Sequence, residues 1–414
     1  MNVNIKKSKL RGSITAKPSK SFAHRYLFAS MLANNESVIK NVDFSNDINA
    51  TLNCIYAYGK RFVKDIDNNC VFFSQESLKN FEPTFDCDES GTTLRICMPI
   101  AMSKYESCNF IGKERLIERG VSVYENIFKY ITFDKSKYSI KAKGGLTPGR
   151  YELVGNVSSQ YISGLLYALP LLKKDSEIVI TTELESKNYI LMTLDVLKKY
   201  GIDIKTYNFD SAFDSHSAKI NDNPNPVFKI RGNQKYMAKD FSIEGDFSNI
   251  AFIDAFNYFG NSIRISGLNY QSIQSDKIYK EYFDKLNAGY AEIDIMNCID
   301  LGPVLVTFAA LKNGAKFTNT KRLKIKESDR GFAIAEELKK CNADIIVSEN
   351  EIIVNKKELI KPDVHLKSHN DHRIVMALSL LSTQFDICID DASAVNKSYP
   401  KYFEDLKTLG AEIY

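Results

Sequence analysis

The sequence lacks several features that mark whole classes of protein. Its 414 residues include no tryptophan, five histidines and eight cysteines, and no two cysteines are spaced as CxxC. Cysteines scattered beside apolar residues are typical of buried, reduced thiols, so we expect a cytoplasmic chain without disulfides. The histidines form no HExxH motif, so we expect neither a metal site nor a cofactor.

Long apolar runs and blocks of like charge are also missing. The most apolar stretches, 162–172 and 374–381, fall short of the roughly 20 residues that a membrane-spanning helix needs. Residues 1–20 carry several lysines and lack the apolar core of a signal peptide. Lysine and arginine number 55 against 51 acidic residues, a net charge of +4 without a basic arm for nucleic acid. We therefore expect a soluble protein without membrane or nucleic-acid partners.

What the sequence does contain is a recurring local pattern. A helix-type segment ends at a residue suited to the left-handed region, and a strand-type segment follows. With 44% hydrophobic residues the chain can build two or three cores of ordinary domain size. The recurrence predicts repeated α/β units. The expected left-handed helix stops are Gly59, Gly201, Gly289, Asn342 and Gly410.

Four predicted helices begin with an arginine close to their first turn, namely Arg25, Arg95, Arg330 and Arg373. A cation there opposes the helix dipole at a cost of about 0.3–1 kcal/mol. The densest charge lies at 324–330, where we expect Ser328 or Glu327 to cap a helix over 331–340. Helix openings with arginine, lysine and hydroxyl donors suit phosphates and carboxylates, so the pattern predicts one shared polyanionic ligand.

Seven motifs then lead to a family. They are KPSKSFAHR (17–25), SGTTLR (90–95), SSQY (158–161), EGDFSN (244–249), KESDR (326–330), NDHR (370–373) and NKSYP (396–400). In this order, and spread over nearly the whole chain, they resemble those of 5-enolpyruvylshikimate-3-phosphate synthase.

The resemblance implies an α/β fold of two similar domains, each built from three βαβαββ units as an inside-out α/β barrel. The active site is implied to lie in the cleft between the domains. The lower domain would comprise 1–17 plus 244–414 and carry the phosphoenolpyruvate and catalytic side. The upper domain would comprise 18–243 and bind mainly shikimate 3-phosphate.

The family reaction moves the carboxyvinyl group of phosphoenolpyruvate to the 5-hydroxyl of shikimate 3-phosphate and releases phosphate. By motif position, the implied catalytic residues are Asp300, Glu327 and Lys20. The implied contacts of shikimate 3-phosphate are Lys20, Ser21, Arg25, Ser158, Ser159, Gln160, Ser186, Tyr189, Asp300 and Lys326. The implied contacts of phosphoenolpyruvate are Lys20, Gly91, Arg119, Gln160, Arg330, Arg373 and Lys397.

Three positions depart from common family patterns. Gly120 stands where proline is frequent, Glu89 where some members carry asparagine, and Arg322-Leu323 where some carry Asn-Trp. Two other functions remain open at this point: the related enolpyruvyl transfer to UDP-N-acetylglucosamine, and non-catalytic binding of phosphoanions or RNA ends. We expect residues 112–120, which include Arg119, to form a loop. The UDP-sugar enzyme normally uses a loop cysteine, and 113–120 contains none. We expect a monomer acting on small molecules.

Overall fold

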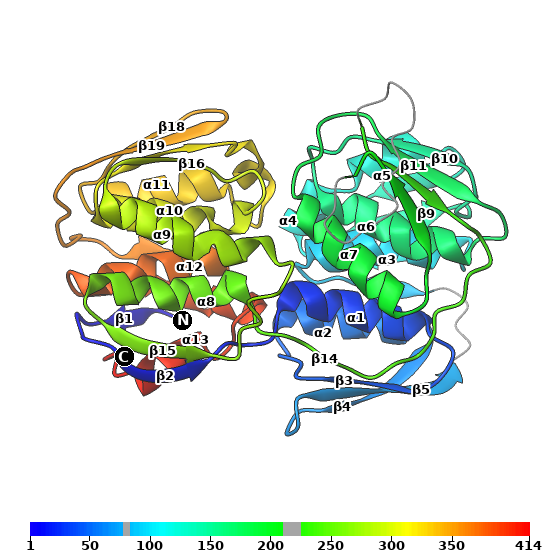
Figure 1. Cartoon of the computed structure of the whole chain (residues 1–414), viewed down its shortest axis with the longest axis horizontal. Helices are drawn as coiled ribbons and strands as arrows, with labels where there is room; N and C mark the ends of the chain where they lie inside the picture. Colours follow the sequence, from blue (N-terminus) through cyan, green and yellow to red (C-terminus); the bar gives the residue numbers. More distant parts are fainter. Residues whose placement is uncertain (78–82, 210–224) are drawn as a thin grey trace. The chain divides into compact units, whose positions relative to one another are not determined.

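Sheets backed by helices recur along the chain in the computed structural model, which describes residues 1–77, 83–209 and 225–414 (Figure 1). The chain divides into two units. Unit 1 comprises Met1–Ser19 and Glu244–Tyr414, and unit 2 comprises Lys20–Ile243. Unit 1 is therefore assembled from both ends of the sequence, and both termini lie in it.

Unit 2 contains three four-stranded sheets with one shared topology. In each sheet, the strand at one edge pairs in parallel with its neighbour. The other two strands form an antiparallel hairpin, which pairs with that neighbour in the antiparallel direction. In spatial order the sheets are β14 (Phe241–Ser242), β3 (Ser37–Lys40), β5 (Cys70–Ser77) and β4 (Lys60–Asp65); β6 (Thr84–Asp86), β7 (Ser107–Ile111), β9 (Ser139–Lys143) and β8 (Thr132–Lys135); and β10 (Arg150–Leu153), β11 (Ser176–Ile180), β13 (Val227–Ile230) and β12 (Ile204–Tyr207). The helices are α1 (Lys20–Leu32), α2 (Asn46–Ala57), α3 (Gly91–Met102), α4 (Glu114–Arg119), α5 (Ser122–Ile127), α6 (Ser159–Ala168), η1 (Leu169–Leu171) and α7 (Lys187–Lys199).

Unit 1 repeats this topology in full in one sheet and in part in two others. Its sheets are β16 (Ala291–Asp294), β17 (Ala315–Thr318), β19 (Glu351–Asn355) and β18 (Asp344–Val347); β20 (Leu366–Lys367), β21 (Ile387–Asp390) and β1 (Val3–Ile5); and the shorter parallel pair β2 (Arg11–Thr15) and β15 (Ser262–Ser266). Ile413 continues the second sheet by bridging Ile5. The helices are α8 (Phe247–Asp254), η2 (Ala255–Phe259), η3 (Ser275–Ile278), α9 (Tyr279–Ala288), η4 (Ile299–Leu301), α10 (Gly302–Leu311), η5 (Lys321–Ile325), α11 (Arg330–Lys339), α12 (His372–Ser379), η6 (Leu380–Thr383), η7 (Ala392–Lys397) and α13 (Tyr402–Thr408).

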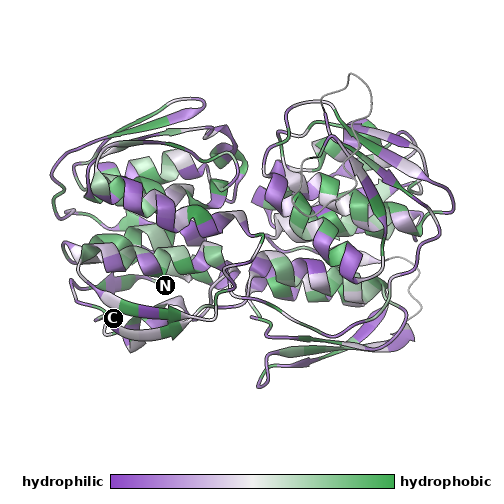
Figure 2. Ribbon diagram, in the orientation of Figure 1, coloured by the Kyte–Doolittle hydropathy of each residue, from purple (hydrophilic) through white to green (hydrophobic). Residues whose placement is uncertain are grey.

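Helices form the interior of each unit, and the sheets lie outside them. Every residue of α12 is buried. All but the last residue of α10 are buried too, because that helix is apolar on nearly every side and has no face for water. Strands such as β19 instead alternate buried side chains with partly or fully exposed ones. The outer strands in Figure 2 accordingly mix hydrophobic and hydrophilic residues. Among the described strands the sheets are open, and none closes into a barrel.

Most of the predicted helix stops are confirmed. Gly59, Gly201, Asn342 and Gly410 have φ of 99°, 80°, 68° and 100°, in the left-handed region. The prediction for Gly289 is wrong, because its φ of 175° is extended backbone. Within the described residues no helix is long and apolar enough to cross a membrane.

Two local predictions near the site need correction. The cap of α11 is Asp329, whose side chain accepts from the Phe332 N–H, rather than Ser328 or Glu327. The segment around Arg119 is the helix α4 rather than a loop. That helix ends at Gly120 with φ of 59°, a value that proline cannot adopt, so proline could not replace Gly120 without a change of backbone.

Candidate active site

Arg330 is the centre of a charged cluster in unit 1. Its guanidinium donates to Asp300 Oδ1 at 2.6 Å, to Glu327 Oε2 at 2.7 Å and to Asp371 Oδ2 at 2.8 Å. The side chain is 1% exposed. Burial alone would lower the pKa of Arg330, but the three carboxylates outweigh it and raise that pKa above its ordinary value. Arg330 therefore stays charged and holds three acids in fixed positions.

Asp300 lies among three cations. Besides Arg330, Lys326 Nζ lies 3.1 Å from its Oδ1, and Arg373 Nη2 lies 3.6 Å from its Oδ2. Burial tends to raise the pKa of Asp300, but Lys326, Arg373 and Arg330 together hold it well below its usual range. Asp300 is thus a carboxylate at neutral pH and is suited to accept a hydrogen bond from a hydroxyl. Asp300 lies in η4, directly before α10, which has Pro303 in its first turn.

Lys397 belongs to the same cluster through the turn before α12. Its ammonium, at the end of η7, donates to the Asn370 carbonyl. The next residue, Asp371, accepts from Arg330 and also caps α12 by accepting from the Arg373 N–H at 2.9 Å. The turn 368–371 thus connects three cations of the cluster.

Asp276 is a buried acid near this cluster that sequence reasoning missed. It lies in η3, is 2% exposed, and accepts a hydrogen bond from Ser248. Burial and the nearby Asp300 carboxylate raise the pKa of Asp276, against the attraction of Arg373. Asp276 therefore keeps its proton to a higher pH than Asp300 does, and acid–base sites use pairs of carboxyls whose pKa values are separated in this way. No motif in the sequence distinguishes Asp276 from an ordinary surface acid.

Arg25 is the buried cation of a second polar cluster, in unit 2. Its guanidinium donates to Thr193 Oγ1 at 2.9 Å, to the Ser21 carbonyl at 2.7 Å and to the Tyr189 carbonyl at 2.9 Å. The side chain lies against the Tyr189 ring, and burial lowers the pKa of Arg25. Within the described part of the chain Arg25 forms no ion pair. A buried guanidinium held only by neutral acceptors is a ready partner for a bound anion.

Arg95 is in a similar position near the start of α3. Its Nη1 donates to Gln160 Oε1 at 2.7 Å, and its guanidinium lies over the Tyr161 ring. Arg95 and Arg119 both approach Gly91. A Cβ at this position would lie 2.9 Å from Arg95 Nη1 and 3.1 Å from Arg119 Nη2. A side chain at position 91 would therefore displace the ends of both arginines from their present positions.

The remaining predicted residues of unit 2 line helix openings. Lys20 pairs with Asp47 Oδ2 at 2.7 Å, and Ser158 caps α6, of which Ser159 is the first residue. Ser186 precedes α7 with φ of 54° and is 2% exposed. A left-handed conformation at a non-glycine residue stores strain of about 1–3 kcal/mol and clusters at functional sites.

The structure thus brings the predicted residues together in two groups. In unit 1, Arg330 and Arg373 already have carboxylate partners. In unit 2, Arg25 and Arg95 form no ion pair among the described contacts. The shared polyanionic ligand stays a prediction for all four arginines. Thr193 and Asp47 were missed as well, because they contact the motif residues only through the fold.

Solved structures define the class of fold. The chain matches an EPSP synthase from Acinetobacter baumannii with a TM-score of 0.75 at 19% identity, covering 100% of this chain and 99% of that one. It matches the enolpyruvyl transferase NikO from Streptomyces tendae with a TM-score of 0.74 at 14% identity, covering 100% and 98%. The fold is that of the enolpyruvyl transferases, which confirms the predicted class.

The sequence matches narrow this class to a family. The model for "EPSP synthase (3-phosphoshikimate 1-carboxyvinyltransferase)" matches residues 5–406. The 3-phosphoshikimate 1-carboxyvinyltransferase of Clostridium perfringens strain 13 is 39% identical over 99% of this chain and 98% of its own. That of Clostridium novyi strain NT is 37% identical over 100% and 98%. The chain belongs to the EPSP synthase family.

Proposed function

We propose that the chain transfers the carboxyvinyl group of phosphoenolpyruvate to the 5-hydroxyl of shikimate 3-phosphate and releases phosphate. The observation that carries this proposal is the family match over residues 5–406, because that range contains every residue the chemistry requires. The reaction belongs to the pathway that supplies chorismate and the aromatic amino acids.

Both substrates carry a phosphate and a carboxylate, and the two clusters differ in how they accommodate such groups. We assign shikimate 3-phosphate mainly to unit 2, where Arg25 lacks a carboxylate partner among the described residues. Its proposed contacts are Lys20, Ser21, Arg25, Ser158, Ser159, Gln160, Ser186, Tyr189, Asp300 and Lys326. Those of phosphoenolpyruvate are Lys20, Gly91, Arg119, Gln160, Arg330, Arg373 and Lys397. In this assignment 1–17 plus 244–414 is the catalytic domain, and 18–243 is the domain for shikimate 3-phosphate.

The chemistry needs one group to orient the hydroxyl and one to move a proton on carbon. We assign the first role to Asp300, whose low pKa keeps it an acceptor, and the second to Glu327, whose side chain is 18% exposed. Lys20 would stabilise negative charge on the reacting phosphoenolpyruvate. These steps require no metal and no covalent nucleophile.

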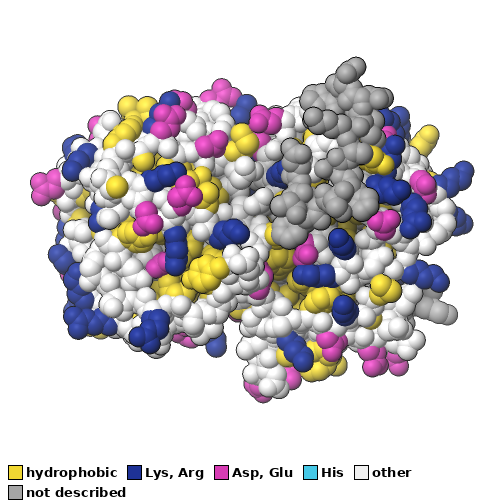
Figure 3. Space-filling view, viewed as in Figure 1, with side chains coloured by type: hydrophobic (Ala, Val, Ile, Leu, Met, Phe, Trp, Pro, Cys, Tyr) yellow, Lys and Arg dark blue, Asp and Glu magenta, His cyan; other side chains and the backbone are white. Residues whose placement is uncertain are grey.

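We also place the protein in the cytoplasm as a monomer that binds neither nucleic acid nor membrane. On the face shown in Figure 3, lysine and arginine side chains are interspersed with aspartate and glutamate. A nucleic-acid surface would instead carry a continuous basic stripe.

Calorimetric titration separates this proposal from its alternatives. Shikimate 3-phosphate should bind, and phosphoenolpyruvate should bind more tightly in its presence. UDP-N-acetylglucosamine and a short 5′-phosphorylated RNA serve as matched anionic controls. Binding of the UDP-sugar or the RNA in place of shikimate 3-phosphate would refute the assignment.

A further inference from the structure

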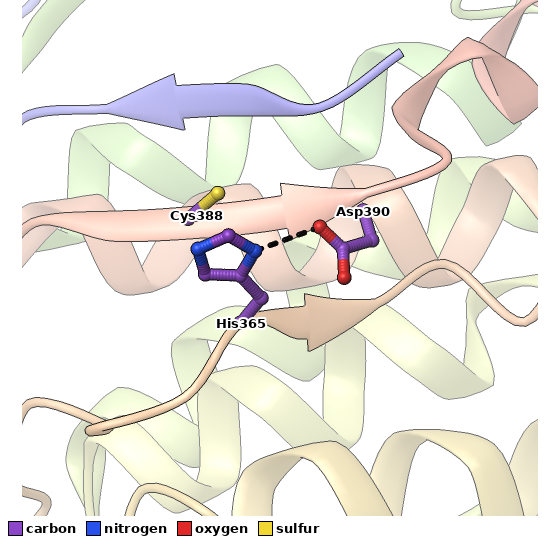
Figure 4. A group of neighbouring side chains, drawn as sticks. All are labelled: His365, Cys388 and Asp390. Atoms are coloured by element: carbon purple, nitrogen blue, oxygen red, sulfur yellow. Dashed lines mark hydrogen bonds and ion pairs between the residues drawn. The ribbon is translucent and has the colours of Figure 1, made fainter.

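Three side chains able to bind a transition metal meet in unit 1, at a distance along the sequence from every residue assigned to catalysis. His365, Cys388 and Asp390 place one ligand atom each within 4.8 Å of the others (Figure 4). The imidazole Nδ1 of His365 lies 2.9 Å from Asp390 Oδ1. The side chains are partly exposed, so an ion can reach them from solvent.

Strand register explains why the three meet. β20 runs parallel to β21 with Leu366 opposite Ile389, and both of these side chains are fully buried in the core. Because side chains alternate along a strand, Cys388 and Asp390 lie together on the other, outer face of β21. His365, immediately before β20, reaches the same face. His365 and Cys388 are 23 positions apart in the sequence, which explains why motif spacing did not indicate the cluster.

The ligand set suits zinc. Thiolate, imidazole and carboxylate are its usual protein ligands, and bonds of about 2.0–2.3 Å place two ligand atoms on one ion about 3.3–3.6 Å apart. The present 2.9 Å separation of nitrogen and oxygen needs to open only slightly when an ion replaces the shared proton. We propose that His365, Cys388 and Asp390 bind one zinc-type divalent ion, with water in the fourth position. The thiol proton passes to solvent as the Cys388 sulfur coordinates.

The nearby His369 differs from His365 because its carboxylate partner accepts several other hydrogen bonds. It stands four residues after His365 and lies 2.8 Å from Glu337 Oε1, while Glu337 Oε2 accepts from Lys340 at 2.6 Å and from the Lys367 N–H at 2.8 Å. Both oxygens of Glu337 already accept hydrogen bonds, so the pair of Glu337 and His369 is poorly suited to bind a metal ion. The cluster of His365, Cys388 and Asp390 has a single internal hydrogen bond among the described contacts.

The position of the cluster gives the ion a consequence. β20 leads directly into the turn that carries Asp371, and β21 leads into η7, which ends at Lys397. An ion bound between β20 and β21 would hold together the two strands from which the turn with Asp371 and the helix η7 begin. Since it binds the folded chain in preference to the unfolded one, it should raise the melting temperature of the protein.

The test is a titration of tag-free, metal-stripped protein with Co²⁺, which reports a bound thiolate by a sulfur-to-cobalt charge-transfer absorption. We expect one equivalent to bind with this band, Zn²⁺ to displace it, and Zn²⁺ to raise the melting temperature. Cys388→Ser should abolish the band, and His365→Gln should weaken binding by about tenfold or more. Asp363→Asn, two residues from His365 and outside the cluster, should bind as the wild type does.

Enzymatic turnover should stay unchanged in both ligand variants, because neither residue belongs to the proposed catalytic set. Absence of the band in the wild-type protein, or its persistence in Cys388→Ser, would overturn the proposal. If Cys388→Ser fails to fold by circular dichroism, the decision rests on His365→Gln, whose side chain is 57% exposed. Unchanged Co²⁺ affinity in that variant would likewise overturn it.

Discussion

Arg330 and Asp371 form a buried ion pair, with Arg330 Nε 2.8 Å from Asp371 Oδ2 and the two side chains 1% and 0% exposed. Asp371 also caps α12, so one carboxylate fixes the openings of both α11 and α12. Two of the proposed phosphoenolpyruvate contacts, Arg330 and Arg373, therefore depend on the same acid.

Asp371→Asn tests this dependence, because asparagine still caps a helix but cannot neutralise Arg330. Leaving a buried charge with one partner fewer should destabilise the protein by up to about 3–5 kcal/mol. It should also raise the KM for phosphoenolpyruvate more than that for shikimate 3-phosphate. Denaturant unfolding and steady-state kinetics measure the two effects. The control is Asp329→Asn, the cap of α11, which should change both little. Equal effects of the two substitutions would contradict the shared role of Asp371.

Lys397→Ala should weaken phosphoenolpyruvate binding and spare shikimate 3-phosphate. Loss of a charge-assisted contact costs about 1.5–3 kcal/mol, or about 10–100-fold in affinity. Titration calorimetry with each ligand is the measurement. Lys401→Ala removes an exposed lysine four residues away and should leave both affinities unchanged. The assignment fails if Lys397→Ala binds phosphoenolpyruvate as the wild type does.

Asp300 and Glu327 should differ in what their loss removes. Glu327→Gln should bind both substrates nearly normally and lose about 10²–10⁴-fold in turnover, the usual contribution of a general acid or base. Asp300→Ala should lose shikimate 3-phosphate affinity as well as turnover. Solvent-tritium exchange into the methylene of phosphoenolpyruvate should fall in Glu327→Gln. If exchange persists there and disappears in Asp300→Ala at saturating substrate, the two roles are reversed.

Asp276→Asn should change the pH dependence of stability. Burial and the Asp300 carboxylate raise the pKa of Asp276 in the folded state, so the folded chain binds this proton more tightly than the unfolded chain does. The contribution of Asp276 to stability is thus full below its unfolded pKa near 4 and is lost as the pH rises through the folded pKa. Asparagine has no such loss, so the variant should gain stability relative to wild type between pH 4 and about pH 7. A difference independent of pH across unfolding curves would rule this out.

Glu337→Gln tests the support of the turn before α12. Glu337 accepts from His369 and from the Lys367 N–H, and the same turn presents Asn370 to Lys397. The variant should raise the KM for phosphoenolpyruvate severalfold with little change in the affinity for shikimate 3-phosphate. Glu336→Gln is the matched control, because Glu336 is the exposed neighbour on the same helix. Identical kinetics for the two variants would exclude a positioning role for Glu337.

Local chemistry explains what the sequence predicted well. A left-handed stop such as Gly410 and an apolar helix such as α12 are determined by a few adjacent residues, so the repeated α/β units were readable. The motif arginines were readable for the same reason. Gly289 failed because a glycine also permits extended backbone, and only the packing around it selects between the two.

The contacts of the site were less predictable. Asp371 meets Arg330 across 41 residues, and Thr193 meets Arg25 across 168. Such partners are brought together by helix and sheet packing, which no local pattern encodes. The buried Asp276 and the group of His365, Cys388 and Asp390 were missed for the same reason.

The proposed transfer can be followed by phosphorus NMR after purified protein is mixed with phosphoenolpyruvate and shikimate 3-phosphate. We expect inorganic phosphate and a shikimate 3-phosphate bearing a 5-carboxyvinyl ether to appear one for one, and neither to form when shikimate 3-phosphate is omitted. Phosphate release that does not depend on shikimate 3-phosphate, or that requires UDP-N-acetylglucosamine instead, would contradict the proposed transfer.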